Sequence, residues 1–252
     1  MFHRVRFENN HIGNIYDQRG MVHEFDDIIG LIDLAIKRGK KFGSIAQTLI
    51  DKNTIHLSFD DGYKEHLRVA KRIKEKYNFP FEAITFSINI RNSFYSKKLC
   101  MDIIYQWIEN KDAKPFKELF DMALSNIDIN HIKKIIFTDK NYIHLLNSYG
   151  VNLDEYFLNE AELIELSKLF SIGSHSINHS FLTLLSADEV YNELKQSKEF
   201  LELKLKIPID TICYPEGKSN TNIENIAEKI GYKFGLSISG GTNIYKIGRV
   251  IP

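Results

Sequence analysis

The stretch Ile55-His56-Leu57-Ser58-Phe59-Asp60-Asp61-Gly62-Tyr63 decides the fold and the chemistry of this chain. Its first five residues suit the interior of a buried strand, whereas Asp60 and Asp61 end the strand and Gly62 allows a tight turn. Two neighbouring carboxylates at a strand end repel each other unless a positive charge lies beside them, and a metal ion is the obvious candidate. The alternative is a solvated turn in which Asp61 caps the following helix.

Strands and amphipathic helices alternate on both sides of this stretch, which predicts an α/β fold with a parallel sheet or barrel. Strands are expected at 2–7, 55–59, 83–88, 170–173, 211–214, 232–238 and 245–251, and helices at 24–38, 44–50, 63–77, 159–169, 186–206 and 222–230. Ser44, Asn159 and Ser186 are the predicted N-caps, with a capping box at Ser186. The polar segment that contains Gly13 and Gly20 is expected to be a loop.

The segment from about 90 to 158 has a different character, because it contains helical patterns and no convincing strand. The predicted helices are 98–109, 114–125, 128–136 and 139–148. We interpret this segment as a helical insertion between two strand-bearing units of one domain that spans residues 1–252. The residues that could carry chemistry all fall just after strands, where parallel α/β folds and barrels place their ligand sites.

The composition is that of a globular protein with a full hydrophobic core. The chain has 252 residues, of which 43% are hydrophobic and 26% charged, and its formal net charge at pH 7 is zero. A neutral chain gives no electrostatic reason to expect nucleic acid as a partner. No apolar run approaches the length of a membrane span, and the N-terminus lacks the hydrophobic core of a signal peptide. We therefore expect a cytoplasmic protein.

Two histidines, His175 and His179, follow an expected strand, as the two acids do. At positions i and i+4 on one turn, two imidazoles can bind one ion, although a chance surface pair is an equal alternative for this spacing alone. Two histidines and one carboxylate are a common ligand set for zinc or another divalent metal, and they leave a position for water. The second carboxylate could then act as a general base. Other histidines, such as His66, have no partner at ligand spacing and are expected in surface or capping roles.

Three motifs carry a resemblance to a known family. They are Phe59-Asp60-Asp61-Gly62-Tyr63, Gly173-Ser174-His175-Ser176-Ile177-Asn178-His179 and Tyr214-Pro215-Glu216-Gly217. In order and separation they are similar to the first three motifs of the polysaccharide deacetylases, which form carbohydrate esterase family 4 and have the NodB-homology fold. The resemblance covers roughly residues 1–7 and 50–252. It implies a distorted (β/α) barrel of the polysaccharide deacetylase type, interrupted here by the helical insertion.

The resemblance also implies a role for each motif residue. Asp60 would be the catalytic base, and the metal ligands would be Asp61, His175 and His179. Zinc is the expected ion, with cobalt or nickel as alternatives. The reaction would be metal-assisted amide hydrolysis, in which the metal ion and a backbone N–H near the third motif stabilise the oxyanion. The residues expected to contact the substrate are Tyr214, Pro215, Glu216 and Arg249.

The general acid is where this chain departs from the family pattern. Many members place a histidine in a late leucine-x-isoleucine-x-histidine motif, whereas this chain ends in Gly248-Arg249-Val250-Ile251-Pro252. In one branch of the family, the histidine of an initial tyrosine-histidine strand takes this role. Phe2-His3-Arg4-Val5 resembles that strand, so His3 is the expected general acid, and a histidine without catalytic importance is the alternative.

Two further positions bear on the substrate. Glu216 replaces the aromatic residue that usually follows the proline of the third motif, which points to an unusual substrate. Arg249 resembles a late arginine near the active site of related members, with a surface arginine as an equal alternative.

The expected function is that of a metal-dependent hydrolase that removes an N-acetyl group, or another N-acyl group such as formyl, from an amino sugar. Its place would be in surface polysaccharide or glycan-precursor metabolism, with a nucleotide- or lipid-linked sugar as substrate and an extracellular polymer as the second choice. One alternative is a non-catalytic carbohydrate-binding relative that keeps the metal site. Retention of Asp60 beside Asp61 argues against this alternative, and the missing late histidine favours it. Another alternative is a purely structural metal ion.

Overall fold

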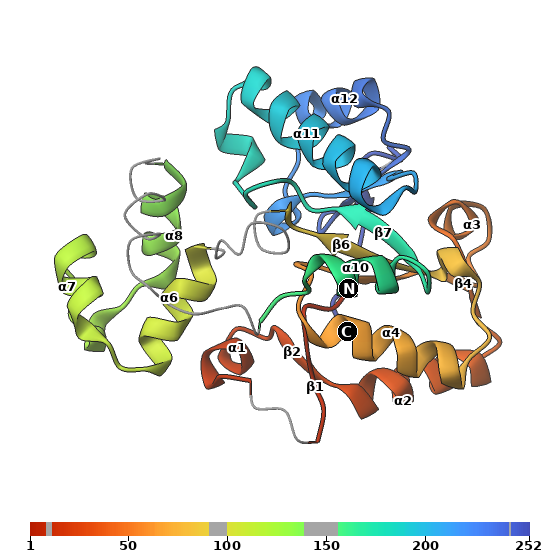
Figure 1. Ribbon diagram of the computed structural model, residues 1–252, viewed down its shortest axis with the longest axis horizontal. Helices are drawn as coiled ribbons and strands as arrows, with labels where there is room; N and C mark the ends of the chain where they lie inside the picture. Colours follow the sequence, from red (N-terminus) through yellow and green to blue (C-terminus); the bar gives the residue numbers. More distant parts are fainter. Residues whose placement is uncertain (9–11, 91–99, 139–155, 242) are drawn as a thin grey trace.

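A six-stranded parallel sheet organises the structure, a computed structural model that describes residues 1–8, 12–90, 100–138, 156–241 and 243–252. The strand order is β10-β9-β8-β7-β6-β5, so each strand lies beside its neighbour in chain order. The strands are β5 (Leu57–Phe59), β6 (Ile84–Ile88), β7 (Ser171–Ser174), β8 (Thr211–Cys213), β9 (Phe234–Ser237) and β10 (Ile247–Gly248). The sheet curls into a half-barrel surrounded by helices (Figure 1), which confirms the expected α/β fold.

The N-terminal residues extend the sheet at its β5 edge. The backbone N–H of Phe2 donates to the carbonyl of Ser58, and the N–H of Asp60 donates to the carbonyl of Phe2, both at 2.9 Å. The short strands outside the main sheet are β1 (Arg4–Arg6), β2 (Val22–Glu24), β3 (Lys41–Phe42) and β4 (Thr54–Ile55), which pair in parallel as β1-β2 and β3-β4. This pairing brings His3 to the carboxyl end of β5.

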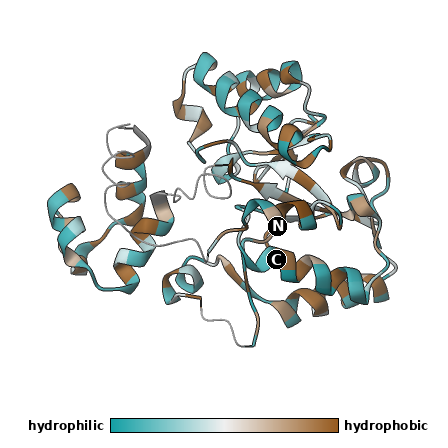
Figure 2. Ribbon diagram, in the orientation of Figure 1, coloured by the Kyte–Doolittle hydropathy of each residue, from teal (hydrophilic) through white to brown (hydrophobic). Residues whose placement is uncertain are grey.

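Amphipathic helices cover both faces of the sheet. They are α2 (Phe25–Lys37), α3 (Ile45–Ile50), α4 (Glu65–Lys76), α10 (Glu160–Leu166), α11 (Ala187–Leu205) and α12 (Thr221–Ile230). α11 and α12 lie on one side, and α2 and α4 on the other (Figure 1). Hydrophobic and hydrophilic residues alternate along these helices (Figure 2), and their apolar side chains pack into one core with Phe59 and Phe86 of the strands. The predicted caps Ser44, Asn159 and Ser186 are confirmed, because each forms a capping box.

The helical insertion projects to one side of the sheet (Figure 1). Its described helices are α6 (Cys100–Glu109), α7 (Ala113–Phe120) and α8 (Ile129–Thr138), as the sequence predicts. The fourth predicted helix, 139–148, lies outside the described residues. The insertion has its own core, which includes Ile104, Trp107 and Phe116 together with Tyr16 from outside the insertion. Among the described residues, no helix is long and apolar enough to span a membrane.

Two expectations about secondary structure are wrong. The segment that contains Gly13 and Gly20 is not simply a loop, because it forms α1 (Asn14–Gln18) and is followed by β2. The last strand is expected at 245–251 but is only two residues long in β10. Both errors have the same cause: these short elements are held by contacts with distant segments, which no local pattern reveals.

Candidate metal and active site

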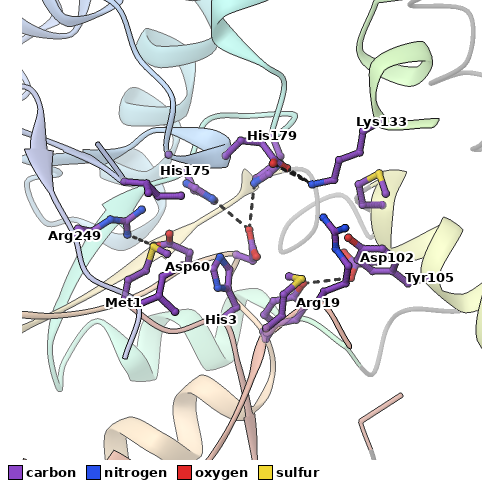
Figure 3. A pocket seen from close by; sticks show the side chains of 18 of the residues that line it. Met1, His3, Arg19, Asp60, Asp102, Tyr105, Lys133, His175, His179 and Arg249 are labelled. Carbon is purple, nitrogen blue, oxygen red and sulfur yellow. Dashed lines mark hydrogen bonds and ion pairs between the residues drawn. The ribbon is translucent and has the colours of Figure 1, made fainter. Parts of the chain in front are cut away.

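The carboxyl ends of the strands surround a pocket of about 190 Å³. β5 leads into Asp60 and Asp61, β7 leads into the loop with His175 and His179, and Arg249 follows β10. Figure 3 shows Asp60 and Arg249 on one side of the pocket, Asp102 and Tyr105 on the other, and the two histidines between them. Parallel α/β folds place ligand sites at this end of the sheet because the strand-to-helix loops converge there.

Three ligand atoms converge in this pocket. The Nε2 atoms of His175 and His179 lie 3.3 Å and 3.4 Å from Oδ1 of Asp61. These separations exceed the 2.7–2.9 Å or so of a charge-assisted hydrogen bond, and Asp61 Oδ1 is buried without a hydrogen-bond donor among the described residues. Carboxylate and imidazole atoms that face one another in this way fit a divalent cation between them. The cluster is therefore able to bind a metal ion.

The backbone of β8 orients one of the imidazoles. Nδ1 of His175 donates to the carbonyl oxygen of Cys213 at 2.7 Å, so Nε2 is the ring nitrogen that faces Asp61. Burial alone would lower the pKa of His175, but Asp61 and Asp60 outweigh it and raise the pKa, so a bound cation would take the place of the proton on Nε2. Burial, together with the charge of His175, lowers the pKa of His179 to about 4, so His179 has the neutral form that ligates metals. Burial alone would raise the pKa of Asp61, but the close imidazoles of His175 and His179 outweigh it and hold the carboxyl ionised.

The site is built on unusual backbone geometry. Asp61, Ser176, His179 and Glu216 all have positive φ angles, of 77°, 63°, 53° and 56°. Four of the seven non-glycine residues with positive φ in the described chain therefore belong to this one site. Residues other than glycine adopt this conformation only where surrounding contacts hold them in it, and such strain concentrates at functional sites.

The two histidines are not on a helical turn, as their spacing suggests, but in an irregular loop. The N–H of His179 donates to Oγ of Ser176 at 3.0 Å, which closes the loop on itself. Glu193, a buried residue of α11, accepts hydrogen bonds from the N–H groups of Ile177 and Asn178 at 3.0 Å and 3.1 Å. Side chains and a distant helix thus replace the helical hydrogen bonds that would otherwise fix the loop.

Asp60 is paired with an arginine rather than with the metal cluster. Nη1 of Arg249 lies 2.8 Å from Oδ1 of Asp60, and the two side chains are only 7% and 2% exposed. The alternative of a surface arginine is therefore wrong. Burial alone would raise the pKa of Asp60, but the charges of Arg249 and His175 outweigh it and keep the pKa well below its usual range. Asp60 is thus an ionised carboxylate beside the cluster.

His3 lies in the wall of the same pocket, between the strand edge and the cluster (Figure 3). Its carbonyl oxygen accepts a hydrogen bond from Nε2 of His66 at 2.6 Å. His66 is completely buried, so its expected surface or capping role is wrong. It anchors the backbone that presents His3 to the pocket.

The third motif contributes one of its side chains to the pocket. Glu216 lines it and binds Nζ of Lys133, from α8 of the insertion, at 2.8 Å. The Tyr214 side chain is fully buried and donates to the carbonyl of Tyr245 at 2.9 Å, so it points away from the pocket. Pro215 is also buried and is absent from the described pocket wall. Contact of the Tyr214 and Pro215 side chains with a substrate therefore has no support in this geometry.

Sequence reasoning missed the residues that the insertion adds to the pocket. Asp102 and Tyr105 of α6 and Lys133 of α8 all line it, as does Arg19, which follows α1. No motif or spacing marks these residues, because they belong to ordinary amphipathic helices. The Lys133–Glu216 ion pair alone offered a signal, since an acid at that motif position calls for a cation.

Comparison with known proteins finds relatives among the polysaccharide deacetylases. The sequence model of the family described as polysaccharide deacetylase matches residues 115–235, which include the second and third motifs. Over these residues, a little under half of its length, this chain is similar to the polysaccharide deacetylase family. Another relative is the protein YxkH of Bacillus subtilis (strain 168), a polysaccharide deacetylase by assignment, which is 30% identical over 88 residues. That alignment covers 34% of this chain and 32% of the relative, so the chain matches about a third of that protein's length.

Solved structures of similar proteins confirm the deacetylase fold. The deacetylase PplD of Streptococcus pyogenes, solved with acetate, has a TM-score of 0.60 at 17% identity, with 99% of this chain and 89% of that chain covered. IcaB of Ammonifex degensii gives 0.63 at 13% identity, with coverages of 100% and 89%. The polysaccharide deacetylase BC0361 of Bacillus cereus gives 0.61 at 18% identity, and this chain covers 62% of its length. These likenesses show the distorted barrel.

Proposed function

We propose that this chain is a metal-dependent hydrolase that removes an N-acetyl group, or another N-acyl group, from an amino sugar in a carbohydrate substrate. The convergence of Asp61, His175 and His179 on one point, with the ionised Asp60 beside it, is the observation that carries the proposal. Similarity to the polysaccharide deacetylase family over residues 115–235 supports the reaction. Zinc suits a site of two imidazoles and one carboxylate, with cobalt and nickel as alternatives.

The residues divide the chemistry between them. Asp61, His175 and His179 would hold a divalent cation, which would supply Lewis acidity toward the acyl carbonyl and the attacking water. Asp60 takes the proton from the attacking water as general base. Arg249 holds Asp60 in place at 2.8 Å and keeps it ionised, so the base is ready at neutral pH.

The leaving amine needs a proton from the other side of the pocket. His3 supplies it in our proposal, because it lines the same pocket as Asp60 and Asp61. His66 holds its backbone by a hydrogen bond, and His3 lies between the Phe2–Phe59 bridge and β1, so the segment that carries the imidazole is fixed on both sides. Glu216 faces the same space and would contact the substrate.

Acetate release from N-acetylglucosamine oligomers, with zinc added, tests this proposal. Replacing Asp60 by Asn removes the base while keeping the side chain's size, and we expect activity to fall by about 10²–10⁴-fold. A matched control is Asp26→Asn, which changes an exposed acid of α2 and should leave the rate unchanged. Equal activities of wild type and Asp60→Asn would refute catalysis by this site.

The same assay separates the alternatives. A non-catalytic carbohydrate-binding relative would bind N-acetylglucosamine oligomers but release no acetate under any metal condition. A structural metal ion would make the chain unfold on chelation without any catalysis. The proposal instead requires activity that disappears with the metal ion while the far-UV circular dichroism stays that of the folded chain.

A further inference from the structure

The insertion forms the pocket wall that faces the Asp60–Arg249 pair (Figure 3). Helix α6 contributes Met101, Asp102 and Tyr105 to this wall. Nothing in the proposed mechanism uses any of these residues. Asp102 stands out among them because it is an acidic group, 2% exposed, in a helix that otherwise buries apolar side chains.

One oxygen of the Asp102 carboxyl accepts hydrogen bonds from the protein, and the other accepts none from the described residues. The hydroxyl groups of Tyr16 and Tyr63 both donate to Oδ1, at 2.5 Å and 3.2 Å. No residue that the structure describes donates to Oδ2. A buried carboxyl normally has partners for all its oxygen atoms. Asp102 lines the pocket, and Oδ2 is not among the fully buried atoms without a partner, so this oxygen is available to a ligand that enters the pocket.

Holding this carboxyl in place is unfavourable for the fold. Burial, helped by the charge of Asp61 and opposed by the Tyr16 hydrogen bond, raises the pKa of Asp102 to about 7. A buried, perturbed acid in a cleft is more often found where a protein binds or transforms a substrate than where it only packs. Asp61 and Asp102 line the same pocket.

We propose that Asp102 binds a hydroxyl group of the substrate sugar, which makes the helical insertion part of the substrate-binding site. This inference rests on the proposed function, because it places the acyl group at the Asp61–His175–His179 cluster and the sugar ring toward α6. A carboxyl oxygen accepts a hydrogen bond from a sugar hydroxyl, and a protonated carboxyl also donates one. Tyr16 and Tyr63 fix the orientation of the group by holding Oδ1.

The test compares two variants that each replace one carboxylate by an amide. Asp102→Asn keeps an oxygen for the two tyrosine donors but replaces Oδ2 with an amide group that cannot accept a hydrogen bond. The control Asp26→Asn makes the same change at an exposed position of α2 that does not line the pocket. If Asp102 binds the sugar, Asp102→Asn raises KM for N-acetylglucosamine oligomers about tenfold at pH 8, above the Asp102 pKa of about 7, with kcat within a factor of about three. Asp26→Asn leaves KM within a factor of about two.

A second measurement uses sugars that lack one hydroxyl group. We expect the 3-, 4- or 6-deoxy analogue of N-acetylglucosamine to bind wild type about tenfold more weakly than the parent sugar in calorimetric titrations. Asp102→Asn should bind that analogue and the parent sugar equally. If Asp102→Asn discriminates as wild type does, or both variants change KM alike, Asp102 is not a sugar ligand although deacetylation continues. Failure of wild type to bind or hydrolyse any of these sugars would overturn the proposed function as well.

Discussion

Replacement of Asp102 by Asn should make the protein more stable at pH 8 and change how its stability depends on pH. Asp102 keeps its proton in the folded chain up to a pKa of about 7, whereas its ordinary value is 3.8. A proton held in the folded state and lost on unfolding stabilises the fold at low pH. This contribution is fully present below about pH 4 and is lost as the pH rises through about 7.

The magnitude follows from the size of the shift. A difference of about three pKa units at roughly 1.4 kcal/mol each gives about 4 kcal/mol as an upper limit between pH 4 and 8. Asn carries no titrating proton and still accepts hydrogen bonds from Tyr16 and Tyr63. The stability of the variant therefore lacks the pH dependence that Asp102 gives to wild type. Its new amide N–H₂ needs a partner, which reduces the gain, and we expect Asp102→Asn to exceed wild type by about 2 kcal/mol at pH 8.

Urea unfolding of chelated protein at pH 5, 6, 7 and 8 measures the effect. The quantity of interest is the difference in unfolding free energy between variant and wild type, because other titrating groups cancel in it. The exposed Asp26→Asn serves as control, with a difference that stays constant across these pH values. A constant difference for Asp102→Asn as well would refute the conclusion that Asp102 holds a proton in the folded state.

Three further substitutions test individual contacts. Arg249→Gln leaves Asp60 buried without a cation and should lower the free energy of unfolding, measured in urea, by about 3–5 kcal/mol. A decrease of less than about 1 kcal/mol would instead indicate a surface role for the arginine. Gly217→Ala places a Cβ at φ +63° against Ile238 and should cost about 1–3 kcal/mol, seen as a lower melting temperature; an unchanged melting curve would contradict this strain. His3→Ala should reduce kcat by about 10²–10⁴-fold without loss of bound metal, and an unchanged kcat would remove His3 as the general acid.

Local patterns in the sequence account for much of the fold. The buried run at β5 and the capped helices at Ser44, Asn159 and Ser186 appear where the sequence predicts them. These elements depend on residues within one turn or one strand, so short-range propensity and periodicity are enough to find them. Short elements such as α1 depend on contacts with distant segments, so local sequence patterns do not predict them.

The candidate site shows the same division. The sequence motifs predict Asp61, His175 and His179 as ligands, because ligand residues close together in the chain have a recognisable spacing. The partners that position the site are far away in the chain: Arg249 follows Asp60 by 189 residues. Asp102 is 39 residues from Tyr63 and 86 from Tyr16. Such pairs become visible only when the chain has folded, since no periodicity links them.

The central claim is that the Asp61–His175–His179 cluster binds a divalent ion on which deacetylation depends. The most direct measurement titrates zinc into chelated protein while acetate release from N-acetylglucosamine oligomers is followed. We expect no activity before zinc is added, a rise that saturates at one ion per chain, and neither binding nor activity in His179→Ala. The control His131→Ala, in an exposed residue of α8, should behave as wild type does. Full activity in the chelated protein, or undiminished activity in His179→Ala, would contradict the claim.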